Sequence, residues 1–371
     1  MIEQLILRRL KLPLKTPYRL AFAELVCFET LLIEARDEDG RKGFGEATYL
    51  PGYGSESLDD AWSIAQQIAP HLVNRRPDAA RRAAALHLAG RPFTATAFVT
   101  AFEMLEDHPL LGPKAPARIP LLAGLNGTGE QEIEARLAEG YRTLKVKVGF
   151  DPDEDLKRVR QIQRRVAGRA ELRLDANQGW TRDQALGFVG ALDPAGIELL
   201  EQPCPAGDWE AAAAVAQAAP LPLMLDESIY RPSDIERAAQ LGAAGMIKLK
   251  LMKLGGLEAL AAALERIAEL GMTAVLGNGV AGELGCWMEA AVARDRLAAA
   301  GEMNGFLRAR MGLFATPLKV ERGQLLLPAD RPRVDPNRLA DTCEAAAVFP
   351  SHAAVSVSIE RICTDSVPTR S

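Results

Sequence analysis

Two lysines two positions apart are the first residues in this chain whose types and spacing could do chemistry. Lys145 and Lys147 lie in the short apolar run TLKVKVG, residues 143–149. Side chains two positions apart leave the same face of a β-strand, so both ammonium groups should point into one place. A like charge nearby and partial loss of water both lower the pKa of an ammonium group, which lets a lysine act as a general base near neutral pH. For a single lysine, a structural salt bridge is the alternative.

Three acidic residues follow, each at the end of a short apolar run. They are Asp175 in LRLDANQ, Glu201 in ELLEQP and Asp226 in MLDES. A single acid in such a place commonly caps the next helix or hydrogen-bonds a loop. Three in series, flanked by lysines, favour a shared site, and three carboxylates suit Mg²⁺, which keeps its other positions for water or substrate oxygens. Zinc is disfavoured because no histidine or cysteine accompanies them.

A second lysine pair, Lys248 and Lys250 in MIKLKLMKLGG, repeats the spacing of the first. Either of the two could face the carboxylates. Lysines on both sides of a metal-bound substrate could remove a proton from one face of a carbon and return a proton to the other. The order of lysines, carboxylates and lysines therefore predicts a site for metal-assisted proton abstraction.

Short β-rich runs alternate with amphipathic helices through the segment that carries these residues. The pattern starts with PLLAGL followed by EQEIEARLAEG and ends with a short run near GEMNGF. Eight such units predict a parallel (β/α) TIM-like barrel over residues 118–318, and glycines after the expected helices, such as Gly140 and Gly242, support the division. Because the C-terminal ends of the strands meet at one mouth of such a barrel, the acids and lysines should converge there.

Residues 1–117 predict an α+β domain that caps the barrel. Runs at 2–10 and 27–36 are typical of strands, and a turn signal, DEDG, leads from the second run to KGFGEATY. Apolar residues then recur at helical spacing in three alanine-rich stretches. The proline-rich HPLLGPKAPARIP marks the boundary, because closely spaced prolines resist both helix and central strand.

Residues 319–371 should return to the capping domain and end in a tail. The run PLKVERGQLLLP predicts a strand hairpin that could join the N-terminal sheet. From residue 336 onward the periodicity is weak, and we expect this tail to be partly disordered or packed late.

The bulk composition favours a compact protein that acts on small molecules. The chain has 371 residues, 48% of them hydrophobic, and a net charge of −5 with both signs interspersed. This excludes a basic footprint for nucleic acid or for a membrane surface. No run approaches the ~20 apolar residues of a membrane span, and no signal peptide is evident. With five scattered cysteines and no CxxC pair, a cytoplasmic location is expected.

The motifs KVKVG, LDANQ, EQP, LDES and KLMKLGG, in this order, resemble the signature of the enolase superfamily, in particular its muconate-lactonizing enzyme subgroup. The resemblance spans about residues 1 to 325. It implies a modified, enolase-type barrel and a Mg²⁺ ion, replaceable by Mn²⁺, held by Asp175, Glu201 and Asp226. It also implies that a substrate carboxylate binds the metal and that the metal stabilises the enediolate formed when the α-proton leaves.

Under this resemblance Lys147 and Lys250 are the acid and base, and Lys145 tunes Lys147 and contacts the substrate carboxylate. The family pattern resembles KxxKxGG, which favours Lys250 over Lys248 and places Lys253 at its second lysine. Residues 109–351, which contain the predicted barrel, include no histidine, and this excludes the mandelate-racemase-like subgroup with its His-Asp dyad.

Other positions match the family less specifically. Asn177 should support the metal ligands, and Glu283 aligns with a family glutamate near the site, although a glutamate in the first turn of a helix is an equal alternative. Substrate selectivity in this family comes from loops of the capping domain, here residues 17–27 and 50–57, where Phe22 and Tyr53 are candidates. Glu302 and Asn304 in GEMNGF occupy the place where dipeptide epimerases carry an Asp-x-Asp for the substrate ammonium.

The implied reaction is racemisation or epimerisation of an amino-acid derivative or a dipeptide. A muconate-type cycloisomerase or an o-succinylbenzoate synthase-like dehydratase is the alternative. A relative that has lost its chemistry, or a barrel aldolase with a lysine Schiff base, would not need three carboxylates and two lysine pairs. By analogy with other capped barrels, we also expect a homo-oligomer.

Overall fold

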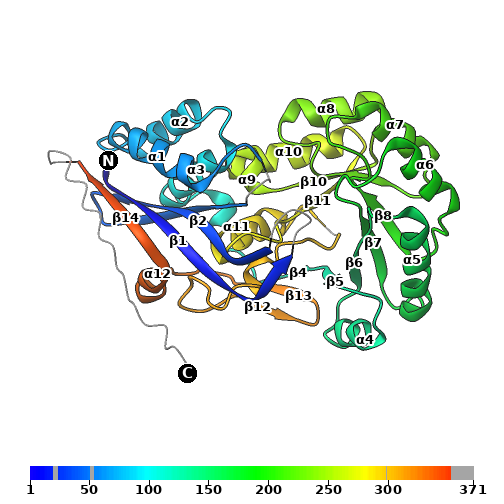
Figure 1. The fold of residues 1–371 in the computed structure, drawn as a ribbon. Coiled ribbons are helices and arrows are strands. Elements are labelled where there is room, and N and C mark those ends of the chain that lie inside the picture. Colours follow the sequence, from blue (N-terminus) through cyan, green and yellow to red (C-terminus); the bar gives the residue numbers. More distant parts are fainter. Residues whose placement is uncertain (20–23, 51–53, 298, 352–371) are drawn as a thin grey trace, which may run out of the picture.

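The computed structural model describes residues 1–19, 24–50, 54–297 and 299–351. An antiparallel sheet with helices packed against it lies beside a curled parallel sheet that is surrounded by helices (Figure 1). This confirms the predicted barrel with an N-terminal α+β capping domain. No helix within these ranges has both the length and the apolar character needed to cross a membrane.

The capping sheet has four strands in the order β14-β1-β2-β3. Alternate residues, such as Leu5 on β1 and Leu31 and Ile33 on β2, are fully buried, because the period of two sends them to the face that the helices cover. The strands are β1 (Ile2–Arg19), β2 (Glu24–Asp37), β3 (Lys42–Tyr49) and β14 (Cys343–Pro350). The helices of this domain are α1 (Leu58–Ile68), η1 (Ala69–His71), α2 (Pro77–His87), α3 (Pro92–Leu105) and η2 (Pro109–Leu111).

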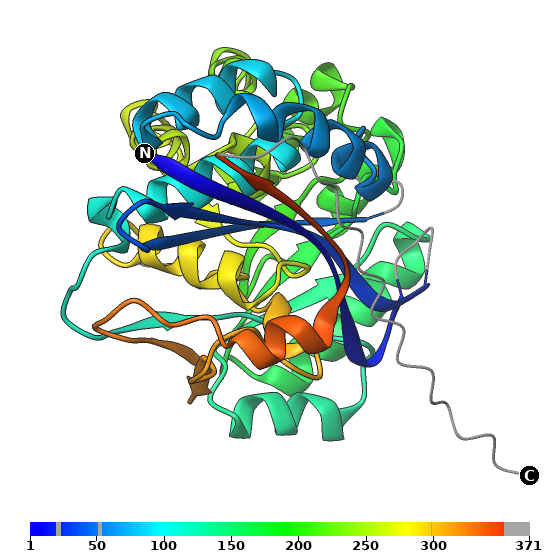
Figure 2. The same ribbon diagram turned by 90° about the vertical axis from the view of Figure 1, so that its left-hand side faces the viewer.

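Part of the C-terminal segment, for which the sequence predicts partial disorder or late packing, is packed against the capping domain. Residues 336–350 form α12 (Pro336–Thr342) and β14, which lies antiparallel to β1 (Figure 2). Ala347 and Phe349 are buried against the capping core. The sequence signal is weak because half of the hydrophobic residues of β14 are alanines. Residues 352–371 lie outside the described residues.

The predicted hairpin after the barrel is present but pairs elsewhere. Strands β12 (Lys319–Glu321) and β13 (Gln324–Leu327) form the hairpin, and β13 pairs with β4 (Ala117–Pro120) in a separate three-stranded sheet. The prediction that this hairpin joins the N-terminal sheet was therefore wrong, because β14 takes the place beside β1.

The barrel sheet is parallel and contains seven strands in the order β11-β10-β9-β8-β7-β6-β5. Its strands are β5 (Ala123–Leu125), β6 (Thr143–Lys147), β7 (Glu171–Asp175), β8 (Ile197–Glu201), β9 (Leu223–Leu225), β10 (Met246–Leu249) and β11 (Thr273–Leu276). Its helices are α4 (Glu130–Ala138), α5 (Pro152–Val166), α6 (Arg182–Ala191), α7 (Trp209–Ala218), α8 (Pro232–Leu241), α9 (Leu251–Leu254), α10 (Leu257–Glu269), α11 (Glu283–Ala293) and η3 (Gly305–Leu307).

The run predicted as an eighth barrel strand is reduced to a single parallel bridge between Leu121 and Gly301. The N–H of Glu302 donates to the carbonyl of Leu276 at 3.0 Å, and the N–H of Leu122 donates to the carbonyl of Gly301 at 3.0 Å. This short segment thereby connects the end of β11 with the chain just before β5 and closes the ring.

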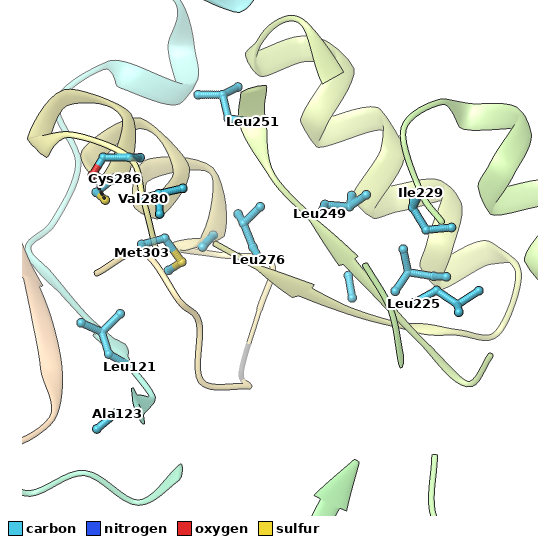
Figure 3. Packing of buried hydrophobic residues seen from close by; sticks show 14 of the residues in the cluster. Leu121, Ala123, Leu225, Ile229, Leu249, Leu251, Leu276, Val280, Cys286 and Met303 are labelled. Carbon is cyan, nitrogen blue, oxygen red and sulfur yellow. Dashed lines mark hydrogen bonds between the residues drawn. The ribbon is translucent and has the colours of Figure 1, made fainter. Parts of the chain in front are cut away.

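Alternation along the barrel strands separates an outer apolar layer from a charged interior. Leu225, Leu249 and Leu276, on three successive strands, belong to the apolar cluster that the helices cover (Figure 3). Lys248 and Lys250 flank Leu249 and therefore point to the other side, into the ring. A small inner cluster of Leu199, Met224, Met246 and Val275 fills the ring below them.

Candidate functional site

The structure brings the predicted lysines and acids together at the C-terminal end of the barrel strands. On neighbouring strands Lys147 is in register with Asp175, and Asp175 with Glu201. Asp226 directly follows β9, and Lys250 directly follows β10. In the sheet order, β10 and β6 are separated by three strands, so their lysines approach the acids from opposite sides of the ring.

Lys145 lies between two of the predicted metal ligands. Its Nζ is 2.8 Å from Oδ2 of Asp175 and 2.9 Å from Oε2 of Glu201, and all three side chains are buried. Burial disfavours the charged lysine, but the two carboxylates outweigh this and raise the pKa of Lys145 well above its ordinary value. The pKa lowering expected from a lysine pair is therefore reversed at Lys145, because carboxylates contact its ammonium directly.

Lys147 is the accessible member of the first pair. Its side chain is 46% exposed, and its Nζ lies 2.6 Å from Oδ2 of Asp175. It also donates to the amide oxygen of Asn177, whose backbone has a left-handed φ of 43°. The amide nitrogen of Asn177 donates in turn to Oε1 of Glu227 at 2.9 Å. The structure thus places Asn177 at the site, where it links Lys147 to a further carboxylate.

Two lysines on the other side of the ring hold Asp226. Nζ of Lys250 is 2.7 Å from Oδ2 of Asp226, and Nζ of Lys253 is 2.8 Å from Oδ1. Burial opposes the charge on Lys250, but the Asp226 carboxylate raises its pKa above the ordinary value. Burial dominates at Lys253, which lies over the ring of Tyr230, and lowers its pKa to about 8.

Lys248 and Glu302 form a buried ion pair deeper in the ring. Nζ of Lys248 contacts Oε2 of Glu302 and lies 2.9 Å from Oε1 of Glu201. Glu302 also accepts from Lys145 at 3.3 Å. Burial acts to raise the pKa of Glu302, but the neighbouring lysines lower it below its ordinary value. Glu302 is therefore a charged group already neutralised by two lysines.

The chemistry of the donor set fits a hard divalent cation. Asp175, Glu201 and Asp226 offer only oxygen atoms, are 0–3% exposed and end adjacent strands. Lys145 shows that Asp175 and Glu201 can present oxygens to one shared cation. With the side chains as they stand in the described ranges, no three acidic, histidine or cysteine residues have the spacing of a metal site. Lysines neutralise these carboxylates instead, so a metal ion would replace ammonium contacts.

Some predicted residues lie apart from this cluster. Glu283 begins α11, and its carboxylate accepts from the backbone N–H groups of Phe314 and Leu318 at 2.8 and 2.7 Å. It therefore anchors the chain that follows the barrel. Asn304 donates to the carbonyl of Leu122 at 3.1 Å and holds the ring closure. The predicted candidates Phe22 and Tyr53 lie outside the described residues.

Two residues were missed by the sequence reasoning. Glu227 lies beside Asp226, and burial raises its pKa to about 7. Its Oε2 is buried and has no hydrogen-bond partner among the described residues. Gln202 accepts from the N–H groups of Asp226 and Ser228 at 3.0 and 3.1 Å and so fixes the turn after β9. The acid that follows the predicted ligand Asp226 in LDES was an available signal for Glu227.

Comparison with known proteins agrees with this architecture. Residues 130–332 match the family model described as "Enolase C-terminal domain-like". An L-Lys-D/L-Arg epimerase of Methylococcus capsulatus is 33% identical over 71% of this chain and 77% of its own length. Muconate cycloisomerase 1 of Rhodococcus opacus is 30% identical over 86% of this chain and 91% of its own.

A solved structure gives the same result for the fold. The muconate lactonizing enzyme of Pseudomonas fluorescens, in complex with muconolactone, superposes with a TM-score of 0.83 at 26% identity. The match covers 92% of this chain and 99% of that enzyme. The similarity thus includes the capping domain as well as the barrel.

Proposed function

Because the chain belongs to the enolase C-terminal domain-like family of enzymes, we propose that it is a Mg²⁺-dependent racemase or epimerase that moves the proton next to a substrate carboxylate. The relatives described above are an epimerase and two muconate-converting isomerases, which supports an isomerase of this superfamily, with a lyase such as a dehydratase as the alternative. The substrate we propose is an amino-acid derivative or a dipeptide.

One observation carries the proposal. Lys147 and Lys250 approach the same acidic cluster from β6 and from the end of β10, on opposite sides of the ring. A planar carbon acid held between them would present one face to each lysine. One lysine would accept the α-proton and the other would return a proton to the opposite face, which inverts the centre. Asn177 would orient Lys147 through its amide oxygen.

Asp175, Glu201 and Asp226 would hold the metal. When bound, Mg²⁺ would supply a Lewis acid for the substrate carboxylate and so offset the charge that develops as the proton leaves. The buried lysines Lys145 and Lys248 would hold the acids in place, and Lys145 would also contact the substrate carboxylate. The apolar cluster beneath them would keep bulk water from the reacting carbon.

The state of Glu302 favours a substrate whose nitrogen carries no charge. Its carboxylate contacts Lys145 and Lys248, so an incoming ammonium would compete with two resident cations. An N-acylated amino acid meets this condition better than a dipeptide does. The same observation supports a second candidate, a cycloisomerase acting on a dicarboxylate that has no amino group.

The test is deuterium uptake from D₂O with Mg²⁺, followed by NMR and mass spectrometry. The substrates to compare are N-acyl amino acids, dipeptides and unsaturated dicarboxylates. We expect exchange with inversion for wild type and a loss of at least about 10³-fold in racemisation for Lys147→Ala and Lys250→Ala. Lys157→Ala, an exposed lysine on α5 paired with Glu154, is the matched control.

Each result leads to a different assignment. A new ring or loss of water without inversion would transfer the assignment to the cycloisomerase or dehydratase. A substrate adduct on either lysine trapped by borohydride would point to Schiff-base chemistry instead. Full activity in both lysine variants would refute the two-base proposal.

A further inference from the structure

A cavity of about 370 Å³ lies between the capping sheet and residues 331–340. We call it the basic cavity and define it by its charged lining: Arg8, Glu34, Arg36, Lys42, Arg331 and Arg333. Its lining residues come from the face of β1, β2 and β3 that is opposite to α1, α2 and α3, and from α12. Figure 2 shows α12 on the side of the sheet away from those three helices. Its size is in the range that binds small molecules.

The charge of the basic cavity is unusual for this protein. Five cationic side chains line the cavity with one carboxylate, and Asp107 outside the lining pairs with Arg331, which leaves a local excess of three positive charges, whereas the whole chain carries −5. Glu34 cannot neutralise the excess, because Arg8 and Arg36 already occupy its two oxygens, each at 2.6 Å. The Glu34 side chain is 2% exposed, so it serves to position these two arginines.

Two of the cations keep donors for a ligand. Within the part of the chain that the structure describes, Arg333 has no hydrogen-bond or ion-pair partner for its side chain, and it is exposed at the rim. Lys42 has only a 3.5 Å contact with Glu34 and is 47% exposed. Arg331 is held rigidly, since it donates to the carbonyl of Met104 at 3.0 Å and to Asp107 at 2.8 Å.

The other walls are apolar. Phe44 on β3, Met104 at the end of α3 and Leu339 on α12 face the same space. Ordered arginines beside apolar walls select anions with a planar charged group and a hydrophobic body, because guanidinium groups bind carboxylate or phosphate through two parallel hydrogen bonds. An inorganic anion would pair with the cationic side chains but would leave the apolar walls exposed to water.

This cavity is separate from the barrel mouth. Among the described residues, the lining of the basic cavity includes none of the five lysines at the barrel mouth. A ligand in the basic cavity would therefore not touch those lysines.

We propose that the basic cavity is a binding site for a small organic dianion with an apolar body, such as an aryl phosphate or an aromatic dicarboxylate. The cationic residues would bind the charged groups, and Phe44, Met104 and Leu339 would cover the apolar part. This site is independent of the isomerase reaction, because binding there needs neither Mg²⁺ nor the barrel lysines.

Isothermal titration of the full chain with phenyl phosphate tests the proposal. We expect saturable binding to wild type that is about tenfold or more weaker in Lys42→Gln/Arg333→Gln, since two charge-assisted contacts are lost. A matched control, Arg82→Gln/Lys157→Gln, removes the same charge from exposed helices and should bind as wild type does. Phenol has only the apolar ring and inorganic phosphate has only the charged group, so each should bind more weakly than phenyl phosphate.

A further variant separates this site from the barrel mouth. Lys147→Gln should keep full affinity for phenyl phosphate, and loss of affinity there would show that the probe binds at the barrel mouth. Absence of saturation at millimolar phenyl phosphate would overturn the proposal. Equal affinity of wild type and Lys42→Gln/Arg333→Gln would do the same.

Discussion

Lys248 is the buried cation that the proposed proton transfers leave unused. It is 2% exposed and contacts the carboxylates of Glu201 and Glu302. Burial opposes its charge, but these carboxylates raise its pKa above the ordinary value. A charge in this position compensates acids that are desolvated inside the ring, so we assign Lys248 a structural role.

Replacing this lysine by an apolar side chain of similar length should destabilise the fold. Lys248→Met leaves Glu201 and Glu302 with one fewer buried partner, and we expect the free energy of unfolding in urea to fall by about 3 kcal/mol. Adding Glu302→Gln should restore part of this loss, because it removes one orphaned charge. Lys157→Met, at an exposed ion pair, should change stability by less than about 1 kcal/mol. No recovery in the double variant would contradict this role for Lys248.

At the scale of residues, the sequence predicted the cluster because its chemistry follows strand periodicity. Lys145, Lys147 and Asp175 could be placed on one side of the sheet from a period of two alone. Glu283 was ambiguous for a local reason, since it lies at the start of a helix. What decided its contacts was the distant segment containing Phe314, which no local pattern indicates.

The first turns of two barrel helices donate hydrogen bonds to carboxylates of the capping domain. Glu46 on β3 accepts from the N–H of Gly285 at 2.8 Å, in the first turn of α11. Glu103 on α3 accepts from the N–H of Leu257 at 2.9 Å, at the start of α10. Glycine at position 282 leaves room for the Glu46 contact, because an added Cβ would lie 2.6 Å from the Glu46 carboxylate and displace it. These contacts satisfy helix N–H groups across the domain boundary.

The buried carboxylates at this boundary should make stability depend on pH. Burial raises the pKa of Glu46 to about 7 from an ordinary value near 4.5, so the folded chain binds a proton more tightly than the unfolded chain. The contribution of Glu46 to the free energy of unfolding is fully present below pH 4.5. It is lost as the pH rises through 7, which lowers the free energy of unfolding by up to about 3 kcal/mol. Glu46→Gln should therefore lose less stability between pH 5 and pH 8 than wild type.

Urea unfolding at pH 5 and pH 8 measures this difference. Glu265→Gln, an exposed glutamate on α10, is the control and should follow wild type at both values. Glu103, whose pKa burial also raises to about 7, would still titrate in the Glu46 variant, so we expect the pH dependence to be reduced and not abolished. An unchanged difference in Glu46→Gln would refute this account of the boundary.

At the scale of elements, strands with alternating large residues were predictable and alanine-rich ones were not. The alternation of apolar residues in β1 and β2 is clear from the sequence, but β14 is rich in alanine. In addition, β14 and its partner β1 are more than three hundred positions apart in the sequence. The partner of the β12–β13 hairpin could not be predicted either. A hairpin pattern specifies its own turn but not which third strand it joins, here β4.

A cluster of buried charges lies inside the ring of strands. Asp175, Glu201, Asp226 and Glu302 face five lysines there, so the cluster is close to neutral without a metal. The sequence predicted the acids as ligands but not that lysines would bridge them, because side-chain pairing inside a ring depends on closure of the whole barrel. A bound cation must therefore compete with these ammonium groups, and its effect on global stability is measurable without any substrate.

Thermal unfolding with and without Mg²⁺ provides that measurement. If the three acids hold the ion, Mg²⁺ at about 100 times its dissociation constant stabilises the fold by about 2.7 kcal/mol, which for a chain of this length raises Tm by about 3 °C. EDTA should reverse the rise. In Asp226→Asn, Mg²⁺ should no longer raise Tm, whatever the Tm of this variant without Mg²⁺, because one of the three carboxylates is gone. Asp295→Asn, which removes an exposed acid paired with Lys114, should keep it. An equal Mg²⁺ effect on both variants would mean that the ion binds outside the barrel mouth.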